Sequence, residues 1–206
     1  MKWLRVPPLP AMSLRRLVIA LAGVAVTALV VVGLLQAKGT TASAPSPLTL
    51  AQMKASLAGS PPQLTALHAQ ADELLDGGLP AVRARLHELA GTPIVVNKWA
   101  SWCGPCRAEF GIFQRVSVTQ GHRVAFLGID SGDANRSNAI AFLHTFPISY
   151  PTYYDQSGQA GLAVTDSSFT PVTVFYNRNG GVFIHQGQYP SVAKLEQDIR
   201  LYALEG

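Results

Sequence analysis

Residues 95–110 read VVNKWASWCGPCRAEF. The stretch opens inside a β-rich apolar run, Ile94 to Trp99, and passes into residues 105–118, a segment that can form a helix. The two cysteines of the chain, Cys103 and Cys106, lie where the strand ends and the helix begins. The sequence therefore predicts a strand, a turn and a helix, with both cysteines at the start of the helix.

Segments further along the chain continue this order. Residues 123–129 predict a second strand and residues 134–146 a second helix, and a βαβα order implies parallel pairing. Residues 177–180 contain an Asn-Gly pair between two apolar runs, which indicates a hairpin. The expected fold class is α/β, with a central mixed sheet flanked by helices. The hairpin strands are predicted over residues 172–176 and 181–185, and a last helix over residues 191–204.

Residues 49–91 are expected to form a helical extension before a main domain of residues 92–206. One helix is predicted after Ser60-Pro61 and is ended by Asp76-Gly77-Gly78. A second helix is predicted over residues 79–89, before Gly91-Thr92-Pro93. The apolar residues at helical spacing in the first helix are Leu64, Leu67, Ala71, Leu74 and Leu75.

The N-terminal part of the chain predicts a membrane anchor. Residues 17–35 read LVIALAGVAVTALVVVGLL, and as a helix they are long enough to span a hydrocarbon layer of about 30 Å. We therefore expect a tail at residues 1–16, an anchor at 17–37 and a flexible linker at 38–48. Four basic residues lie in the tail, so the positive-inside rule places the rest of the chain outside the cytoplasm.

A cleaved signal peptide is the alternative interpretation of this segment. Ala42-Ser43-Ala44 has the small-x-small form of a cleavage site, although the apolar run is longer than most signal sequences. The chain would then be secreted, again outside the cytoplasm. The net charge of +4 depends in part on the basic tail, and no clustered basic and aromatic stripe is present, so no nucleic-acid partner is expected.

The spacing of the cysteines predicts redox chemistry. If Cys103 lies near the N-terminus of a helix, unpaired backbone N–H groups and the helix dipole favour its thiolate, the nucleophilic form of the side chain. Cys106 is close enough to form a disulfide with it, so two electrons can be exchanged without a cofactor. A purely structural disulfide is the alternative, but so short a loop would stabilise the fold only weakly.

Metal and haem sites are poorly supported. The chain has no second CxxC motif, and the position after Cys106 is Arg107, where covalent haem attachment needs a histidine. No metal is therefore expected. The five histidines are scattered along the chain, at His68, His87, His122, His144 and His185.

The stretch of residues 95–110 resembles the thioredoxin-like proteins of the TlpA/ResA type, which are extracytoplasmic and often tethered by one N-terminal helix. The resemblance continues more weakly through residues 150–155, Thr170-Pro171 and the hairpin. It implies a thioredoxin-like fold in which Pro171 follows a cis peptide bond and faces the cysteine pair, while Thr170 presents its backbone to substrate.

The resemblance also assigns supporting roles around the cysteines. Trp102 would form part of the active-site surface, and the Gly104-Pro105 pair is similar to that of reducing thioredoxins. Glu109 matches a carboxylate that could relay protons near Cys106, or else it is an exposed helix residue. Asn97 stands where cytoplasmic thioredoxins carry a buried acid.

Two positions depart from the family pattern. Lys98 replaces an apolar residue, and we expect it to be a solvated strand residue, with a role near the thiolate as the alternative. Gly111 stands where many members have a proline that kinks the helix.

The expected function is that of a membrane-anchored thiol-disulfide oxidoreductase that reduces disulfides of cysteine-containing extracytoplasmic proteins, in cytochrome c maturation by analogy. A membrane thiol reductant or oxidant would recharge the pair. Alternatives are a copper-delivery module, with His144 or His185 as third ligand, and a peroxide-reducing enzyme.

Overall fold

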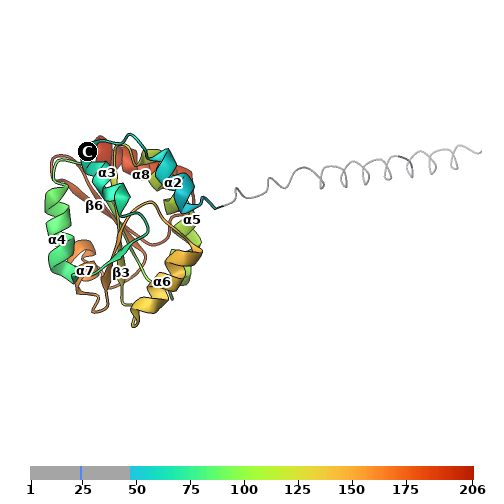
Figure 1. Cartoon of the computed structure of the whole chain (residues 1–206), viewed down its shortest axis with the longest axis vertical. Helices are drawn as coiled ribbons and strands as arrows, with labels where there is room; N and C mark the ends of the chain where they lie inside the picture. The colour runs from blue at the N-terminus through green and yellow to red at the C-terminus, as the bar shows by residue number, and fades with distance from the viewer. Residues whose placement is uncertain (1–23, 25–46) are drawn as a thin grey trace, which may run out of the picture. The chain divides into compact units, whose positions relative to one another are not determined.

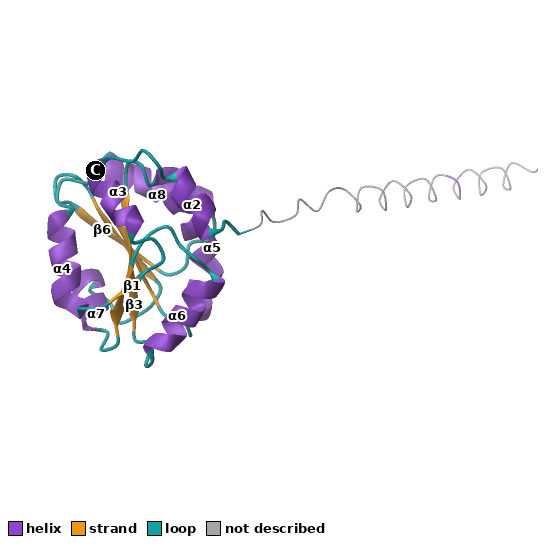
Figure 2. Ribbon diagram, in the orientation of Figure 1, coloured by secondary structure: helices purple, strands orange, loops and turns teal. Residues whose placement is uncertain are grey.

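A six-stranded mixed sheet lies at the centre of residues 47–206 (Figure 2). Its strand order is β1-β4-β3-β2-β5-β6. The first four strands of that order pair in parallel, whereas β5 is antiparallel to both of its neighbours. The strands are β1 (Leu74–Leu75), β2 (Ile94–Trp99), β3 (Ala125–Ser131), β4 (Thr152–Asp155), β5 (Val172–Tyr176) and β6 (Val182–Gln186). The mixed sheet expected from the sequence is thus confirmed.

Helices cover both faces of this sheet (Figure 1). One face packs against α3, α4 and α7, and the other against α5, α6 and α8 with the π-helical turn η1 that continues it. The helices are α2 (Leu50–Ser56), α3 (Pro62–Ala69), α4 (Gly78–Glu88), α5 (Gly104–Gln120), α6 (Arg136–Thr145), α7 (Gln159–Thr165), α8 (Val192–Asp198) and η1 (Ile199–Leu204). The layered arrangement leaves β2 at the centre of the core.

The central strand β2 supplies both halves of the core. All six of its residues are buried. Because side chains alternate along a strand, Ile94 and Val96 pack toward α3 and α4, whereas Val95 and Trp99 pack toward α5 and α6. By the same alternation Lys98 lies on the face of Ile94 and Val96. This strand ends where the cysteine-bearing turn begins.

Most of the predicted elements are confirmed. The strand predicted over Ile94–Trp99 has those bounds, and the predicted helix at 105–118 corresponds to α5, which continues through Gly111. The hairpin turn holds Gly180 with a φ of 83°, in the left-handed region that glycine adopts readily. The last predicted helix, residues 191–204, is observed as α8 and η1.

The first helix of the expected extension is shorter than the apolar spacing suggested. α3 ends at Ala69, and Leu74 and Leu75 form the edge strand β1, paired with Thr152 and Tyr153 of β4. The chain changes direction at Asp72, whose φ is 68° and whose N–H donates to the Tyr150 carbonyl. The two leucines therefore matched a helical period by coincidence.

Besides β1, three short elements were not predicted: α2, β4 and α7. A local signal does exist for α2, because Thr49 and Gln52 form a capping box in which Thr49 Oγ1 accepts from the Gln52 N–H at 3.2 Å. Helix α7 has only seven residues, too few for a clear apolar period.

The computed structural model describes Val24 and residues 47–206, and residues 47–206 form one compact unit. The predicted tail, the predicted anchor at 17–37 and most of the predicted linker lie outside the described residues, apart from Val24. Within the described part of the chain, no helix combines the length and the hydropathy needed to cross a bilayer. Residues 49–91 contribute α2, α3, β1 and α4 to the unit that holds the cysteines.

Candidate active site

Cys103 and Cys106 form a disulfide at the N-terminus of α5, with their Cα atoms 5.3 Å apart. Cys103 is the residue that caps the helix, and its Sγ accepts the Cys106 N–H at 3.2 Å. Pro105 lies in the first turn, where a missing N–H costs no helical hydrogen bond. The sulfur of Cys103 thus lies at the positive end of a 17-residue helix, where a thiolate is stabilised.

The Thr170–Pro171 loop lies against the disulfide. The peptide bond before Pro171 is cis, as expected. The Thr170 carbonyl oxygen is 3.7 Å from Cys103 Sγ, and Thr170 Oγ1 is 3.5 Å from Cys106 Sγ. The hydroxyl itself donates to the Lys98 carbonyl at 3.1 Å, so it presents lone pairs to Cys106. A single residue therefore contacts both sulfurs.

The turn before the disulfide is fixed by a buried carboxylate that the sequence analysis missed. Asp133 accepts the Ser101 N–H at 2.8 Å and the Ser101 hydroxyl at 2.6 Å. Trp102 donates its indole N–H to the Gly132 carbonyl at 3.2 Å while 64% of its surface stays exposed. The strand β3 and the loop after it thereby hold the turn, and the Trp102 ring is presented to solvent next to Cys103.

Glu109 is fully buried, which contradicts the interpretation of it as an exposed helix residue. Asn97 donates from its amide to one carboxylate oxygen at 3.0 Å, and the Tyr189 N–H donates to the other at 2.8 Å. Burial raises the pKa of Glu109 to about 7, against the opposite effect of these two hydrogen bonds. A carboxyl with that pKa can both give and take a proton near neutral pH.

Lys98 is 3% exposed, so the expectation of a solvated residue was wrong. Its ammonium donates to the Ser167 carbonyl at 2.6 Å, in the loop that leads to Pro171. Burial lowers the pKa of Lys98, and the nearby Asp155 carboxylate acts in the opposite direction. The sequence could not show this because the element that covers Lys98, α7, was not predicted.

A second buried acid lies near the turn. Asp130 pairs in register with Trp99 at the end of the sheet and is fully buried. Burial, followed by the carboxylates of Asp133 and Asp155, raises the pKa of Asp130 to about 9. This side chain is therefore protonated at neutral pH, and sequence reasoning gave no indication of it.

The histidines considered as copper ligands do not join the cysteines in a metal-binding group. His144 lies near the end of α6, and His185 stacks on Tyr189 with ring centroids 4.1 Å apart. Across Val24 and residues 47–206, no group of three or more His, Cys, Asp or Glu side chains has a geometry that could hold a metal ion.

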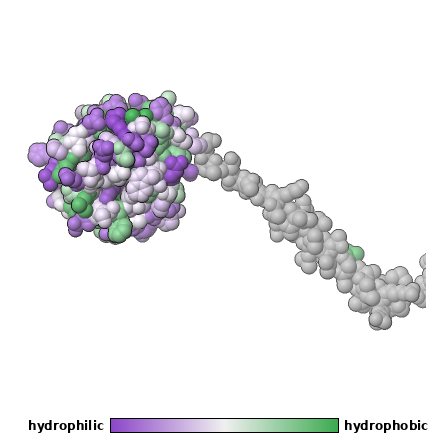
Figure 3. Space-filling view, turned by 90° about the horizontal axis from the view of Figure 1, so that it is seen from below, coloured by the Kyte–Doolittle hydropathy of each residue, from purple (hydrophilic) through white to green (hydrophobic). Residues whose placement is uncertain are grey.

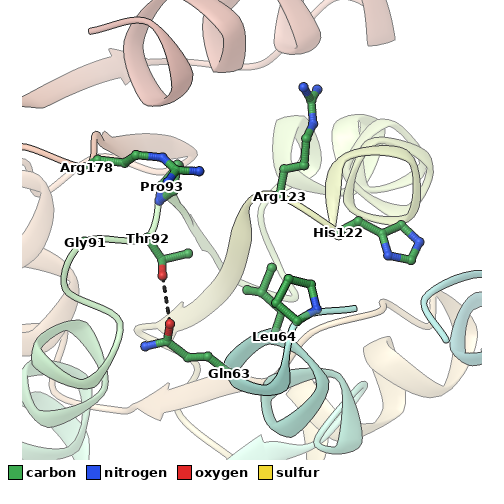
Figure 4. Close-up of a pocket in the computed structure, with 9 residues that line it drawn as sticks. Gln63, Leu64, Gly91, Thr92, Pro93, His122, Arg123 and Arg178 are labelled. Atoms are coloured by element: carbon green, nitrogen blue, oxygen red, sulfur yellow. Dashed lines mark hydrogen bonds between the residues drawn. The ribbon is translucent and has the colours of Figure 1, made fainter. Parts of the chain in front are cut away.

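Two pockets differ in their relation to the disulfide. One, of about 300 Å³, is lined by Lys98, Trp102 and Thr170 and therefore opens beside Cys103. The other, of about 240 Å³, is lined by Thr92, His122 and the two arginines 123 and 178, and its Thr92 hydroxyl donates to Gln63 (Figure 4). This second pocket lies at the N-terminal ends of β2 and β3, whereas the cysteines follow the C-terminal end of β2.

The face of the folded unit seen in Figure 3 is a mixture of polar and apolar residues, with hydrophobic groups in small separate areas. Within residues 47–206, the large hydrophobic side chains that are exposed are Trp102, Leu162, Phe169, Val182 and Leu201. Trp102 and Leu162 line the pocket beside Cys103, and Phe169 lies between two other lining residues, Ser168 and Thr170.

Comparisons with known proteins give partial matches. No protein-family model matches the chain. Over 73 residues the chain is 38% identical to the thiol:disulfide interchange protein DsbE of Yersinia pestis, which covers 35% of this chain and 37% of that protein. Over 98 residues it is 24% identical to the thiol-disulfide oxidoreductase ResA of Oceanobacillus iheyensis, covering 48% and 50%. The matches span half or less of the length of these relatives.

A solved structure supports the fold. The crystal structure of a thiol:disulfide interchange protein DsbE from Chlorobium tepidum, itself described as a tentative assignment, is 28% identical with a TM-score of 0.52. The match covers 56% of this chain and 83% of that one. The thioredoxin-like fold is therefore shared over the part of the chain that carries the cysteines.

Proposed function

We propose that this chain, a thioredoxin-like protein of the TlpA/ResA type, exchanges disulfides with cysteine-containing proteins outside the cytoplasm. The observation that carries the proposal is the Cys103–Cys106 disulfide at the start of α5, in contact with the Thr170–Pro171 loop. A purely structural role for this disulfide is disfavoured, because a disulfide that closes so short a loop adds little to the stability of the fold.

The reaction transfers two electrons from the reduced pair to a partner disulfide. The Cys103 thiolate attacks one sulfur of the partner, a mixed disulfide forms, and the first partner thiolate leaves. Cys106 then attacks Cys103 Sγ, the internal disulfide closes, and the second partner thiolate leaves. Because Cys103 is 3% exposed and Cys106 is fully buried, the first attack belongs to Cys103.

We assign Glu109 as the group that accepts the thiol proton of Cys106. It comes three residues after Cys106 on α5, so the two side chains project from the same side of the helix. Its pKa of about 7 lets it accept the thiol proton as Cys106 becomes a nucleophile and return it in the next cycle.

We further propose that the net direction is reduction, in support of cytochrome c maturation, with a membrane thiol reductant restoring the pair. The Gly104-Pro105 pair, similar to that of reducing thioredoxins, supports this direction. The apolar run at residues 17–35 supports a membrane anchor, and secretion after cleavage is the alternative.

The test is a trapping experiment. Cys106→Ser removes the resolving thiol, so the reaction should stop at the mixed disulfide and partners should appear as adducts that a reductant releases. Cys103→Ser is the matched control and should give none. If Cys106→Ser forms no adducts and the reduced wild-type protein instead binds copper tightly or consumes peroxide, the disulfide-exchange proposal fails.

A further inference from the structure

The pocket beside Cys103 has a polar floor and a rim that carries two exposed apolar side chains. Of its lining residues only Lys98 and Ser131 are buried, so these two form the floor. Trp102 and Leu162 lie at the rim and are 64% and 50% exposed. The remaining lining residues are Gly132, Ser157, Gly158, Ser168 and Thr170.

Lys98 is the one charged residue that lines this pocket. An ammonium has three N–H donors, and one of them is used by the Ser167 carbonyl at 2.6 Å. The charge of the Asp155 carboxylate acts on Lys98, but Asp155 accepts hydrogen bonds from other donors: Ser131 Oγ at 3.2 Å and the Gly161 N–H at 2.7 Å. The floor therefore offers donors and positive charge without a carboxylate in the lining.

The Lys98 side chain passes close to Gly161 of α7, where there is no room for a Cβ atom. A Cβ atom at this position would lie 2.8 Å from Lys98 Cε and 2.4 Å from Ser131 Oγ, closer than such atoms approach. Any larger residue would press on both floor residues. The absence of a side chain at Gly161 thus keeps the floor open.

A partner bound to Cys103 must lie next to this pocket. Trp102 directly precedes Cys103, and the Thr170 carbonyl oxygen is 3.7 Å from Cys103 Sγ. The residue that flanks the partner cysteine is therefore brought to a cavity of about 300 Å³, which has room for one side chain.

We propose, on the basis of the proposed disulfide exchange, that this pocket is a specificity site for the residue flanking the partner cysteine. The pocket accepts a side chain that ends in a hydrogen-bond acceptor, preferably a carboxylate and next an amide. Lys98 donates a hydrogen bond to this acceptor, while Trp102 and Leu162 cover the methylene groups of the same side chain. A lysine or arginine at the same place meets the Lys98 charge and is disfavoured. Lys98 is thus assigned to partner selection rather than to the sulfur chemistry.

The test uses the reduced wild-type protein and symmetric disulfide-linked peptides that differ at one position. Glu, Gln, Leu or Lys is placed directly before the cysteine in one series and directly after it in a second, and the second-order rate constant of exchange with the reduced protein is measured for each. In at least one series the Glu peptide should exceed the Leu peptide by about tenfold, which is about 1.4 kcal/mol at 25 °C, with Lys the poorest.

The variant Lys98→Met keeps the length of the side chain and removes its charge. It also removes the bond to Ser167, so all rates can fall, and the readout is the Glu-to-Leu ratio, which should drop to about one. Arg85→Met is the matched control, because Arg85 is a hydrogen-bonded cation on α4 that donates to Tyr153 and Gln70, outside the pocket. Its ratio should equal that of the wild type.

Equal rate constants of the wild-type protein for all peptides in both series overturn the inference, even if Lys98→Met fails to fold. So does a Glu preference that Lys98→Met leaves intact. A wild-type protein that exchanges with no peptide, while reduced Cys103 remains open to alkylation, contradicts the proposed function itself, which is a different result from loss of selectivity.

Discussion

The buried carboxyl of Glu109 should make the stability of the fold depend on pH in a way that one substitution removes. Burial raises its pKa from 4.5 to about 7. One pKa unit corresponds to about 1.4 kcal/mol, so ionising Glu109 costs the folded state on the order of 3 kcal/mol relative to the unfolded chain. Between pH 4.5 and 7 the folded protein keeps a proton that the unfolded chain releases. Stability therefore falls as the pH rises through this window, and the loss is complete above the folded pKa.

Glu109→Gln carries no titrating group and should lose this dependence. The free energy of unfolding is measured by denaturant titration of the disulfide form of both proteins, from pH 4 to pH 8. As the pH rises from 4 to 8, the free energy of unfolding of the wild type should fall by about 3 kcal/mol relative to that of the variant. Asp72 and Asp130 also have raised pKa values, but they are present in both proteins and cancel.

Glu88→Gln is the matched control, because the Glu88 side chain is 64% exposed. Its pH curve should run parallel to that of the wild type. If the curve of Glu109→Gln is also parallel to the wild type, Glu109 does not have the perturbed pKa, and its assignment as the proton acceptor of Cys106 is lost with it.

Three further predictions concern the site and the location of the chain. Iodoacetamide should label reduced Cys103 faster than Cys106 at neutral pH, because Cys103 caps α5 and is the more exposed; mass spectrometry after partial labelling decides, and the reverse order would exchange their roles. Asp133→Ala removes both hydrogen bonds to Ser101 and should cost about 1–3 kcal/mol in denaturant unfolding, whereas the control Glu205→Ala, at an exposed residue near the C-terminus, should cost close to nothing. A reporter that functions only outside the cytoplasm should be active when it is fused after Gly206. Activity of a reporter that functions only in the cytoplasm would contradict the proposed topology.

The sequence predicts those parts of the fold that have a local cause. The strand Ile94–Trp99 is mostly apolar because both of its faces are buried, and the hairpin turn contains the glycine that its φ requires. The edge strand β1 has no such cause. Leu74 and Leu75 form a strand because β4 lies beside them, and β4 is distant in sequence, so periodicity alone assigned them to a helix.

Side-chain environments depend on contacts that a local pattern does not contain. The alternation of side chains along β2 places Lys98 on one face of the sheet. Whether that face is exposed to water depends on α7, which is too short to be predicted. The same limit applies to Asp133. Its two bonds to Ser101 join segments 32 residues apart, and an acid after a strand is otherwise unremarkable in sequence.

The relation between Asn97 and Glu109 changes the interpretation of the site. From the resemblance alone, Asn97 appeared as the loss of an acid that cytoplasmic thioredoxins carry on this strand. In the structure its amide donates to Glu109 at 3.0 Å, so the strand supplies a donor and the helix supplies the carboxyl. Because Glu109 and Cys106 share α5, their separation is set by helix geometry and does not depend on how the helix packs on the sheet. Asn97 therefore orients the acid together with the Tyr189 N–H, which donates to the other carboxylate oxygen.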